Sequence, residues 1–326
     1  MLTATLLATL ALHVNAPTTQ PAAKNPLLAA ADPHAVVVGD SVWIYPTFTV
    51  NRLPAFYAFT SKDLLKWQQR GPVLRFADVK WINADGNNRH HAWAPCMIEK
   101  DGRFYFYYSV GDQEVTPSRI GVAVGRSPAG PFIDSGKPLP CTGSKGVFEA
   151  IDPMVFTDPK DGKSYFYAGG SNGSKLRVFE LNDDMISFRR EVEVQTPPQF
   201  TEGAFVHERD GKYYLSYSHG GWRDATYSVH YAVGPSPTGP FEYKGAILVS
   251  DDRHKGPGHH SFIRSRDGQW YIVYHRWNAR DGNGPYRGGR SVCIDRMEHD
   301  ADGTIKPIVM TDALAADKFG VPAAKP

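Results

Sequence analysis

The chain has 326 residues, with 36 basic and 34 acidic side chains and a formal net charge of +2 at pH 7. This near-balance gives no electrostatic reason to expect a nucleic acid or an anionic membrane surface as a partner. Apolar residues make up 41% and charged residues 21%, which argues against an intrinsically disordered chain. The 31 glycines, 25 prolines and 12% aromatic residues favour short strands and many turns over long helices.

The N-terminal segment is typical of an exported protein. Residues 1–14, MLTATLLATLALHV, are apolar, and small residues follow at a cleavage-like position, although no basic residue precedes the run. We therefore predict a signal peptide over residues 1–16, a leader over 17–26 and a secreted or periplasmic location. The apolar run is too short to span a bilayer and no later run is long enough, so no membrane insertion is expected. The three cysteines, an odd number, allow at most one disulfide.

A turn followed by an aromatic strand recurs five times along the chain. The turns are Gly39-Asp40, Asp101-Gly102, Asp161-Gly162, Asp210-Gly211 and Asp267-Gly268, and the strands after them include RFYFYYS, KSYFYAG and KYYLSYS. Asp-Gly between such runs is a strong hairpin signal. Repeats of 50 to 60 residues, each holding about four strands, are typical of propeller blades, so we predict an all-β, five-bladed β-propeller over residues 27–326, with about four antiparallel strands per blade around a central channel. A β-sandwich with coincidental hairpins is the alternative.

Counting back eight or nine residues from the turns locates the start of each innermost strand. The residues found there are Asp32, Trp93, Asp152, Glu202 and His259, and each stands in an apolar setting. Because innermost strands line the central channel, these five positions are expected to lie close together. Taken alone, each Asp-Pro could simply initiate a turn. Their recurrence at one repeat position favours a shared site instead.

Three clustered carboxyls would repel one another and titrate as a coupled set, which a purely structural core would avoid. Glycoside hydrolysis needs such groups, since it uses a protonated acid and an ionised base or nucleophile. Trp93 offers a flat face for a sugar ring. The residues therefore indicate a carbohydrate as the partner.

The ordered segments ADPHAV (31–36), HAWAP (91–95), EAIDPMVF (149–156), FTEGAF (200–205) and GPGHHSF (256–262) resemble glycoside hydrolase family 43. The resemblance implies an inverting hydrolase of xylose- or arabinose-containing polysaccharides or oligosaccharides, of the β-xylosidase or α-L-arabinofuranosidase type. It implies that Asp32 is the general base, that Glu202 is the general acid and that Asp152 tunes and orients this acid. No cofactor is required, but a structural calcium ion at His259 is left open. His91, Trp93, His260 and Arg290 are expected to contact the substrate.

Several features stay outside these assignments. The loop of residues 81–89, rich in Asp and Asn, is predicted to shape the pocket rim, and residues 277–287 are predicted to form a functional loop. Gly169-Gly170-Ser171-Asn172-Gly173 fits a nucleophile-elbow pattern, but a strand follows it, so a hairpin loop is the better interpretation. The alternative functions are a retaining fructosidase-type propeller, a non-catalytic sugar-binding propeller and a scaffold for protein partners. The oligomeric state is left open.

Overall fold

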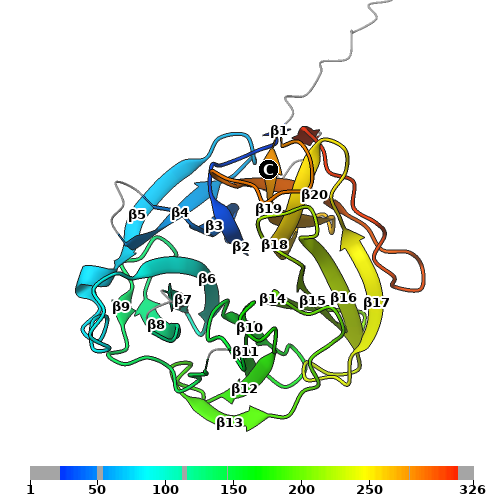
Figure 1. The fold of residues 1–326 in the computed structure, drawn as a ribbon. Helices are drawn as coiled ribbons and strands as arrows, with labels where there is room; N and C mark the ends of the chain where they lie inside the picture. The colour runs from blue at the N-terminus through cyan, green and yellow to red at the C-terminus, as the bar shows by residue number, and fades with distance from the viewer. Residues whose placement is uncertain (1–22, 50–53, 112–115, 145, 279, 315–326) are drawn as a thin grey trace, which may run out of the picture.

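The computed structural model describes residues 23–49, 54–111, 116–144, 146–278 and 280–314. Five antiparallel sheets stand around a central axis like the blades of a propeller, which confirms the predicted fold (Figure 1). The only helical element of the described residues is the 3-10 turn η1 (Phe76–Asp78). Within them, no helix is long and apolar enough to cross a membrane.

Each blade begins at the centre of the ring and runs outward. The first blade contains β2 (Ala31–Val38), β3 (Ser41–Thr47), β4 (Ala55–Ser61) and β5 (Gln68–Arg75), and the second contains β6 (His91–Lys100), β7 (Arg103–Gly111), β8 (Arg119–Gly125) and β9 (Ile133–Asp134). The third contains β10 (Met154–Thr157), β11 (Ser164–Ala168), β12 (Arg177–Leu181) and β13 (Phe188–Val192). The fourth contains β14 (Glu202–Arg209), β15 (Lys212–His219), β16 (Ser228–Gly234) and β17 (Glu242–Leu248), and the fifth contains β18 (His254–Arg264), β19 (Trp270–Asn278) and β20 (Ser291–Met297).

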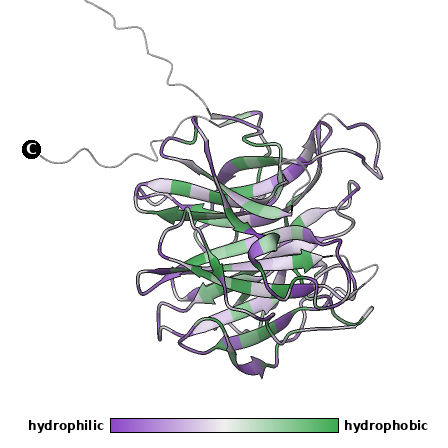
Figure 2. Ribbon diagram, turned by 90° about the vertical axis from the view of Figure 1, so that its left-hand side faces the viewer, coloured by the Kyte–Doolittle hydropathy of each residue, from purple (hydrophilic) through white to green (hydrophobic). Residues whose placement is uncertain are grey.

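The predicted Asp-Gly turns join the first two strands of the second and fourth blades. Lys100 pairs with Arg103 across Asp101 and Gly102, which have φ of 51° and 71°. A two-residue turn with both residues at positive φ matches the twist of the flanking strands. The aromatic strands predicted after these turns are β7 and β15, and their side chains join apolar clusters between neighbouring blades. Apolar residues recur along the strands of the sheets (Figure 2).

Tyrosines of the second strands tie neighbouring blades together. The hydroxyl groups of Tyr45, Tyr107 and Tyr167 donate to main-chain carbonyls of the next blade, at Pro128, Met185 and Pro237 respectively, over 2.5 to 2.7 Å. Buried tyrosine hydroxyls normally find such a partner, because an unpaired buried hydroxyl is costly. The blades are therefore joined by directed bonds as well as by apolar packing.

The N-terminal segment closes the ring on the outer edge of the fifth blade. Asn25 donates to the Ile294 carbonyl at 2.8 Å and accepts from the Ile294 N–H at 2.9 Å. Leu28 pairs with Val292, and β1 (Ala23–Lys24) pairs with β21 (Ala313–Leu314). The leader predicted to reach residue 26 thus ends earlier, because residues 23–26 belong to the fold. The predicted signal peptide lies outside the described residues.

All three cysteines are buried and free. Cys96, Cys141 and Cys293 lie in different parts of the ring, on or near the second, third and fifth blades. Burial raises the pKa of each thiol to about 12. They serve as small apolar core residues.

Candidate active site

The innermost strands share a backbone device at their pocket end. One residue in or just before each innermost strand adopts the left-handed conformation, with φ between 35° and 64°; these residues are Asp32, Ala94, Asp152, Gly203 and His259. In four of the blades, the pairing with the second strand shifts at this point. A positive φ is uncommon outside glycine and clusters at functional sites. Five strands thus turn their first residues toward one centre.

In two blades, the observed alignment of the innermost strands differs from the predicted alignment by one residue. Glu202 and Trp93 were expected at the same position as Asp32, but Gly203 and Ala94 occupy it. The first blade turns on Gly39-Asp40, whereas the second and fourth turn on Asp-Gly, so Asp is the second turn residue in one case and the first in the others. Counting from Asp therefore introduced the shift.

Side chains of each preceding blade bond the main chain of these residues. Thr47 accepts from the Ala94 N–H at 2.7 Å, and Ser109 accepts from the Asp152 N–H at 3.0 Å. Ser218 accepts from the His259 N–H at 2.8 Å, and His275 Nδ1 accepts from the Asp32 N–H at 3.1 Å. Each acceptor lies at the end of a second strand, so neighbouring blades fix the strained residues.

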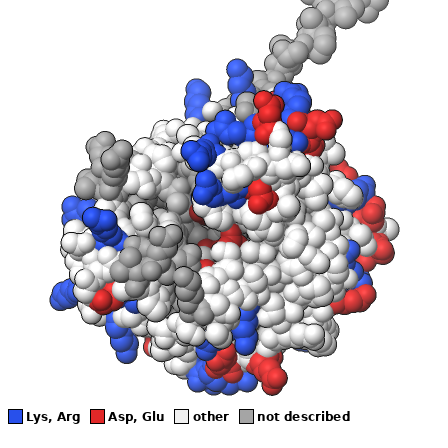
Figure 3. Space-filling view, viewed as in Figure 1, with Lys and Arg blue, Asp and Glu red and all other residues white. Residues whose placement is uncertain are grey.

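These residues surround a pocket of about 810 Å³ at the end of the channel. It is lined by Asp32, Arg89, His90, His91, Trp93, Ile151, Asp152, Ser171, Glu202, Trp222, His259 and Arg290. The space-filling view shows carboxyl groups in the central hollow and basic side chains along part of its rim (Figure 3). Of the predicted site residues, the structure brings together all but His260.

Asp32 is held in its ionised form. Burial raises its pKa, but Arg290, His259 and His275 together outweigh burial and hold the pKa well below its usual range. Arg290 Nη1 lies 2.8 Å from Asp32 Oδ1, and His275 Nδ1 lies 3.2 Å from the same oxygen. An ionised carboxylate beside the pocket can accept a proton from water.

Asp152 and Glu202 form a pair that retains a proton. Burial first, and then the charges of Glu202, Asp32 and Glu149, raise the pKa of Asp152 well above its usual value. Burial also raises the pKa of Glu202, against the opposing effects of the Tyr227 hydroxyl, Arg290 and the Ser171 N–H. Two buried carboxyls that repel each other titrate as one coupled pair, so the pair can supply a proton.

Short contacts orient the pair. Tyr227 donates its hydroxyl to Glu202 Oε1 at 2.7 Å, and its ring stacks on His275 with a centroid distance of 5.6 Å. The Gly203 N–H acts on the Asp152 carboxyl and lowers its pKa. Gly203 follows Glu202 directly, so the main-chain group that lowers the pKa of Asp152 is next to Glu202 in the chain.

Aromatic rings form two walls of the pocket. His91 stacks on Trp93 with a centroid distance of 5.6 Å and an interplanar angle of 1°, and Gly111 leaves room for the indole because a Cβ there would lie 2.0 Å from it. Trp222, from the fourth blade, forms the other wall; it is 40% exposed, and the Arg290 guanidinium lies 4.7 Å from its ring. Such rings can stack on the apolar face of a sugar.

His260 faces away from the pocket, contrary to the expected substrate contact. It is buried, its Nε2 bonds the Ser216 hydroxyl at 2.7 Å, and its ring packs against Phe205 and Phe262. Successive residues of a strand point to opposite faces, and its neighbour His259 already points inward. One histidine of the pair therefore reaches the site.

The calcium ion left open at His259 stays a prediction, and the contacts of this ring are with carboxyls. His259 Nδ1 lies 3.5 Å from Asp152 Oδ2 and 3.7 Å from Asp32 Oδ1, so this ring is engaged with the carboxyls. Calcium takes six to eight oxygen ligands. Among the described residues, no group of three or more His, Cys, Asp or Glu side chains is placed to hold a metal.

The two predicted loops have different roles. Residues 89 and 90 line the pocket, and Asp85 behind them pairs with Arg119 at 2.6 Å, so this loop is a rim held by an ion pair. Trp277, the first residue of the other predicted loop, lies instead in β19, where its fully buried indole donates to the Trp222 carbonyl at 3.0 Å. This residue thus supports the wall formed by Trp222.

Sequence analysis missed Trp222, Tyr227 and His275. Trp222 and Tyr227 lie between β15 and β16, and His275 lies near the end of β19. No repeat signal in the sequence marks these positions. Ser171 was seen only as part of a hairpin loop, yet it lines the pocket. A polar residue at the end of each second strand, as in Thr47 and Ser109, is the pattern that could have pointed to His275.

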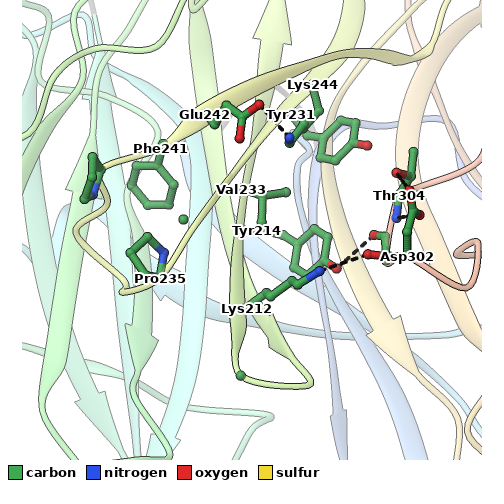
Figure 4. Close-up of a pocket in the computed structure, with 14 residues that line it drawn as sticks. Lys212, Tyr214, Tyr231, Val233, Pro235, Phe241, Glu242, Lys244, Asp302 and Thr304 are labelled. Atoms are coloured by element: carbon green, nitrogen blue, oxygen red, sulfur yellow. Dashed lines mark hydrogen bonds and ion pairs between the residues drawn. The ribbon is translucent and has the colours of Figure 1, made fainter.

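A second cavity of about 780 Å³ lies near the turns of the fourth blade (Figure 4). Tyr214, Tyr231 and Phe241 contribute rings to it, and Lys212 donates to the Asp302 carbonyl at 2.9 Å. Its carboxylate Glu242 is paired with Lys244 at 2.7 Å. This cavity offers no cluster of carboxyls comparable with the first.

Comparison with known proteins identifies the family of this chain. Residues 23–305 match the model of glycosyl hydrolases family 43. A β-D-galactofuranosidase of Aspergillus niger is 36% identical over 89% of this chain and 86% of its own length. A xylosidase/arabinosidase of Humicola insolens is 32% identical over 84% of this chain and 95% of its own.

Solved structures show the same fold. A β-xylosidase/α-arabinofuranosidase from a compost metagenome, in complex with xylotriose and in a calcium-free form, is 29% identical and covers 89% of this chain and 98% of its own, with a TM-score of 0.71. An α-L-arabinofuranosidase of Clostridium thermocellum is 34% identical and covers 87% and 95%, with a TM-score of 0.66. The chain therefore belongs to glycosyl hydrolase family 43 and is a glycoside hydrolase.

Proposed function

We propose that this hydrolase removes terminal sugars with inversion of the anomeric carbon. Asp32 takes a proton from a water molecule, which attacks the anomeric carbon from the face opposite the leaving group. Glu202 gives its proton to the glycosidic oxygen as the bond to the leaving group breaks. Asp152 keeps this proton available and orients Glu202. The products are a free sugar and a shortened chain, and the proton returns from Asp32 to Glu202 through solvent.

The opposed charge states of Asp32 and Glu202 carry this proposal. Both are buried, yet Arg290 holds the pKa of Asp32 down while burial raises that of Glu202. A general base and a general acid must differ in this way at one pH. They come from the first and fourth blades and line the same pocket of about 810 Å³, which can hold a sugar and a water.

Early-time NMR of a hydrolysis reaction tests the stereochemistry. Inversion gives a first-formed anomer opposite to that of the substrate, before mutarotation mixes the two. Retention, as in a fructosidase-type propeller, would give the same anomer and would make one carboxylate a nucleophile. A tightly bound oligosaccharide that stays intact over days would instead revive the non-catalytic interpretation.

A second candidate substrate is a β-D-galactofuranoside. The relative from Aspergillus niger carries that activity in its name and shares 36% identity with this chain. A panel of nitrophenyl β-D-xyloside, α-L-arabinofuranoside and β-D-galactofuranoside separates the candidates by kcat/KM. The first candidates are the xylose- and arabinose-containing substrates that the family resemblance implies. A preference for the galactofuranoside would replace them.

We also propose that the protein is exported. The apolar run of residues 2–14, followed by small residues, supports a cleaved signal peptide. Fractionation of producing cells, with N-terminal sequencing of the mature protein, tests this. A protein that keeps Met1 in the cytoplasm would contradict it.

A further inference from the structure

Glu149 is a buried carboxyl that the proposed mechanism does not use. It lies three residues before Asp152 and is 3% exposed. Its Oε2 accepts the main-chain N–H of Asn172 at 2.9 Å, while its Oε1 is buried without a hydrogen-bond partner among the described residues. A buried carboxyl is costly to keep, so its contacts call for a physical reason.

The partner of Glu149 is the loop of residues 169–174, which packs against the segment before Asp152. A Cβ at Gly170 would lie 2.6 Å from Glu149 Oε2 and 2.5 Å from Ile151, so only glycine lets the loop approach this closely. Gly173, at φ 118°, would likewise meet the main chain of Val147 at 2.7 Å. The Asn172 side chain adds a bond by accepting from the Gly146 N–H at 2.8 Å. The glycines thus serve close packing.

Ser171 connects this loop to the acid. It lines the pocket, and its main-chain N–H acts on the Glu202 carboxyl and lowers its pKa. Ser171 immediately precedes Asn172, whose N–H is bonded to Glu149. The loop that Glu149 bonds at Asn172 therefore contributes its preceding residue, Ser171, to the pocket that Glu202 also lines.

We propose that Glu149 is a positioning residue for the general acid, because it holds the loop that places the Ser171 N–H beside Glu202. The proposal rests on the assignment of Glu202 as the acid. When Glu202 gives up its proton, the Ser171 N–H donates to the carboxylate that forms. A loosened loop would withdraw this donor at the moment when negative charge develops.

The charges around Glu149 agree with this role. Burial raises its pKa to about 7, and the charge of Glu202 adds to this, while the Asn172 N–H and the Ser118 hydroxyl act in the opposite sense. The charged group acting on Glu149 is thus the carboxyl of Glu202, and Glu149 in turn raises the pKa of Asp152. Below pH 7, Glu149 is therefore mostly neutral and can bond the loop without adding a full charge behind Glu202.

Leaving-group dependence tests the proposal. Acid catalysis matters little when the leaving group is a nitrophenolate and much when it is a sugar alkoxide. We expect Glu149→Ala to lower kcat at least about tenfold on a disaccharide, a part of the total contribution of general acid catalysis, but less than about threefold on the matching nitrophenyl glycoside. Glu149→Gln keeps an oxygen that can accept the Asn172 N–H and should restore near wild-type kcat on both.

Two further variants complete the design. Gly170→Ala leaves Glu149 in the chain but drives a methyl group into its carboxyl, so it should reproduce the Glu149→Ala pattern even if that variant does not fold. Glu180→Gln changes another buried glutamate of the same blade, which pairs with Arg190 at 2.8 Å on the outer strands, and should leave the leaving-group dependence unchanged. Equal losses on both substrates, or failure of Gln to rescue, would overturn the proposal.

Amide hydrogen exchange of Ser171 and Asn172 gives a readout without substrate. Glu149→Ala should speed exchange at these two amides at least about tenfold, since a bonded amide must open before it exchanges. Unchanged exchange would overturn the proposal. If the wild-type protein cleaved no glycoside at all, the proposed function would fail, and exchange alone would decide whether Glu149 holds the loop.

Discussion

Arg290 sets the charge of Asp32 through a contact of 2.8 Å, and it also lowers the pKa of Glu202. Arg290→Met removes this positive charge from both carboxyls. The pKa of Asp32 should rise, so the base ionises at higher pH and the acid limb of the kcat/KM profile moves up by on the order of one pH unit. The alkaline limb should move in the same direction, because Glu202 then holds its proton to higher pH.

A pH–rate profile of kcat/KM for wild type and variant measures both limbs. Arg287→Met, in the same loop and exposed, is the matched control and should leave the profile in place. A profile with Arg290→Met that merely drops in height, without moving, would contradict the assigned electrostatic role.

The two carboxyls proposed as base and acid should respond differently when each is replaced by its amide. Asp32→Asn removes the base, so it should lower kcat by about 10²- to 10⁴-fold on every substrate. Glu202→Gln should cause a comparable loss on a disaccharide and a much smaller one on a nitrophenyl glycoside. Steady-state kinetics on the two substrates measures the difference. Near wild-type turnover in both variants would show that other residues do the chemistry.

Strand starts are held by side chains of the neighbouring blade, which can be tested one at a time. Ser109→Ala leaves the Asp152 N–H buried without an acceptor, at a cost of about 1 to 3 kcal/mol of unfolding free energy. Ser218→Ala should cost a similar amount at His259. Denaturant unfolding measures both losses, with Ser144→Ala, an exposed serine, as the control. Losses no larger than that of the control would show that these bonds do not fix the strand starts.

At the level of strands, sequence carried most of the fold and part of the site. The Asp-Gly turns located β7 and β15, because such turns have one dominant conformation. They could not locate the left-handed residues, since a strand irregularity and a different order of Gly and Asp in the first turn change the count without changing the pattern. Trp222 and Tyr227 escaped because they stand after β15 and before β16, where the blades share no motif.

Across the whole molecule, buried histidines predict acid sensitivity. Burial lowers the pKa of His34 to about 4 and that of His207 to about 3. In the unfolded chain a histidine titrates near 6.5, so below that pH the unfolded state binds protons that the folded state does not. The stability that neutral burial provides is therefore complete above about pH 6.5 and is lost progressively as the pH falls toward 4 and 3.

His207→Phe tests this expectation. The ring of His207 stacks on Tyr214 with a centroid distance of 4.8 Å, and neither of its nitrogens has a hydrogen-bond partner among the described residues, so Phe can replace it. Between pH 7 and pH 4, the free energy of unfolding should fall less steeply in the variant than in the wild type. The difference in slope should correspond to at most one proton taken up on unfolding. An identical slope would show that this histidine does not contribute.

Raised carboxyl pKa values act in the opposite direction. Glu149 ionises near pH 4 when unfolded but near 7 when folded, so its burial costs stability as the pH rises through that range. Relative to the wild type, Glu149→Gln should consequently gain more free energy of unfolding at pH 8 than at pH 5. Denaturant titrations at the two pH values measure this difference. A variant equally destabilised at both pH values would contradict a neutral folded-state carboxyl.

Asn25 bonds Ile294 across 269 residues, so a segment near the start of the chain completes the last blade. During synthesis, the ribosome delivers this partner only when nearly the whole polypeptide has emerged. The first four blades therefore form an open ring during synthesis. Its two ends remain unpaired until translation is almost finished. The yield of the protein in a producing cell should thus depend on how well chaperones shield that interval.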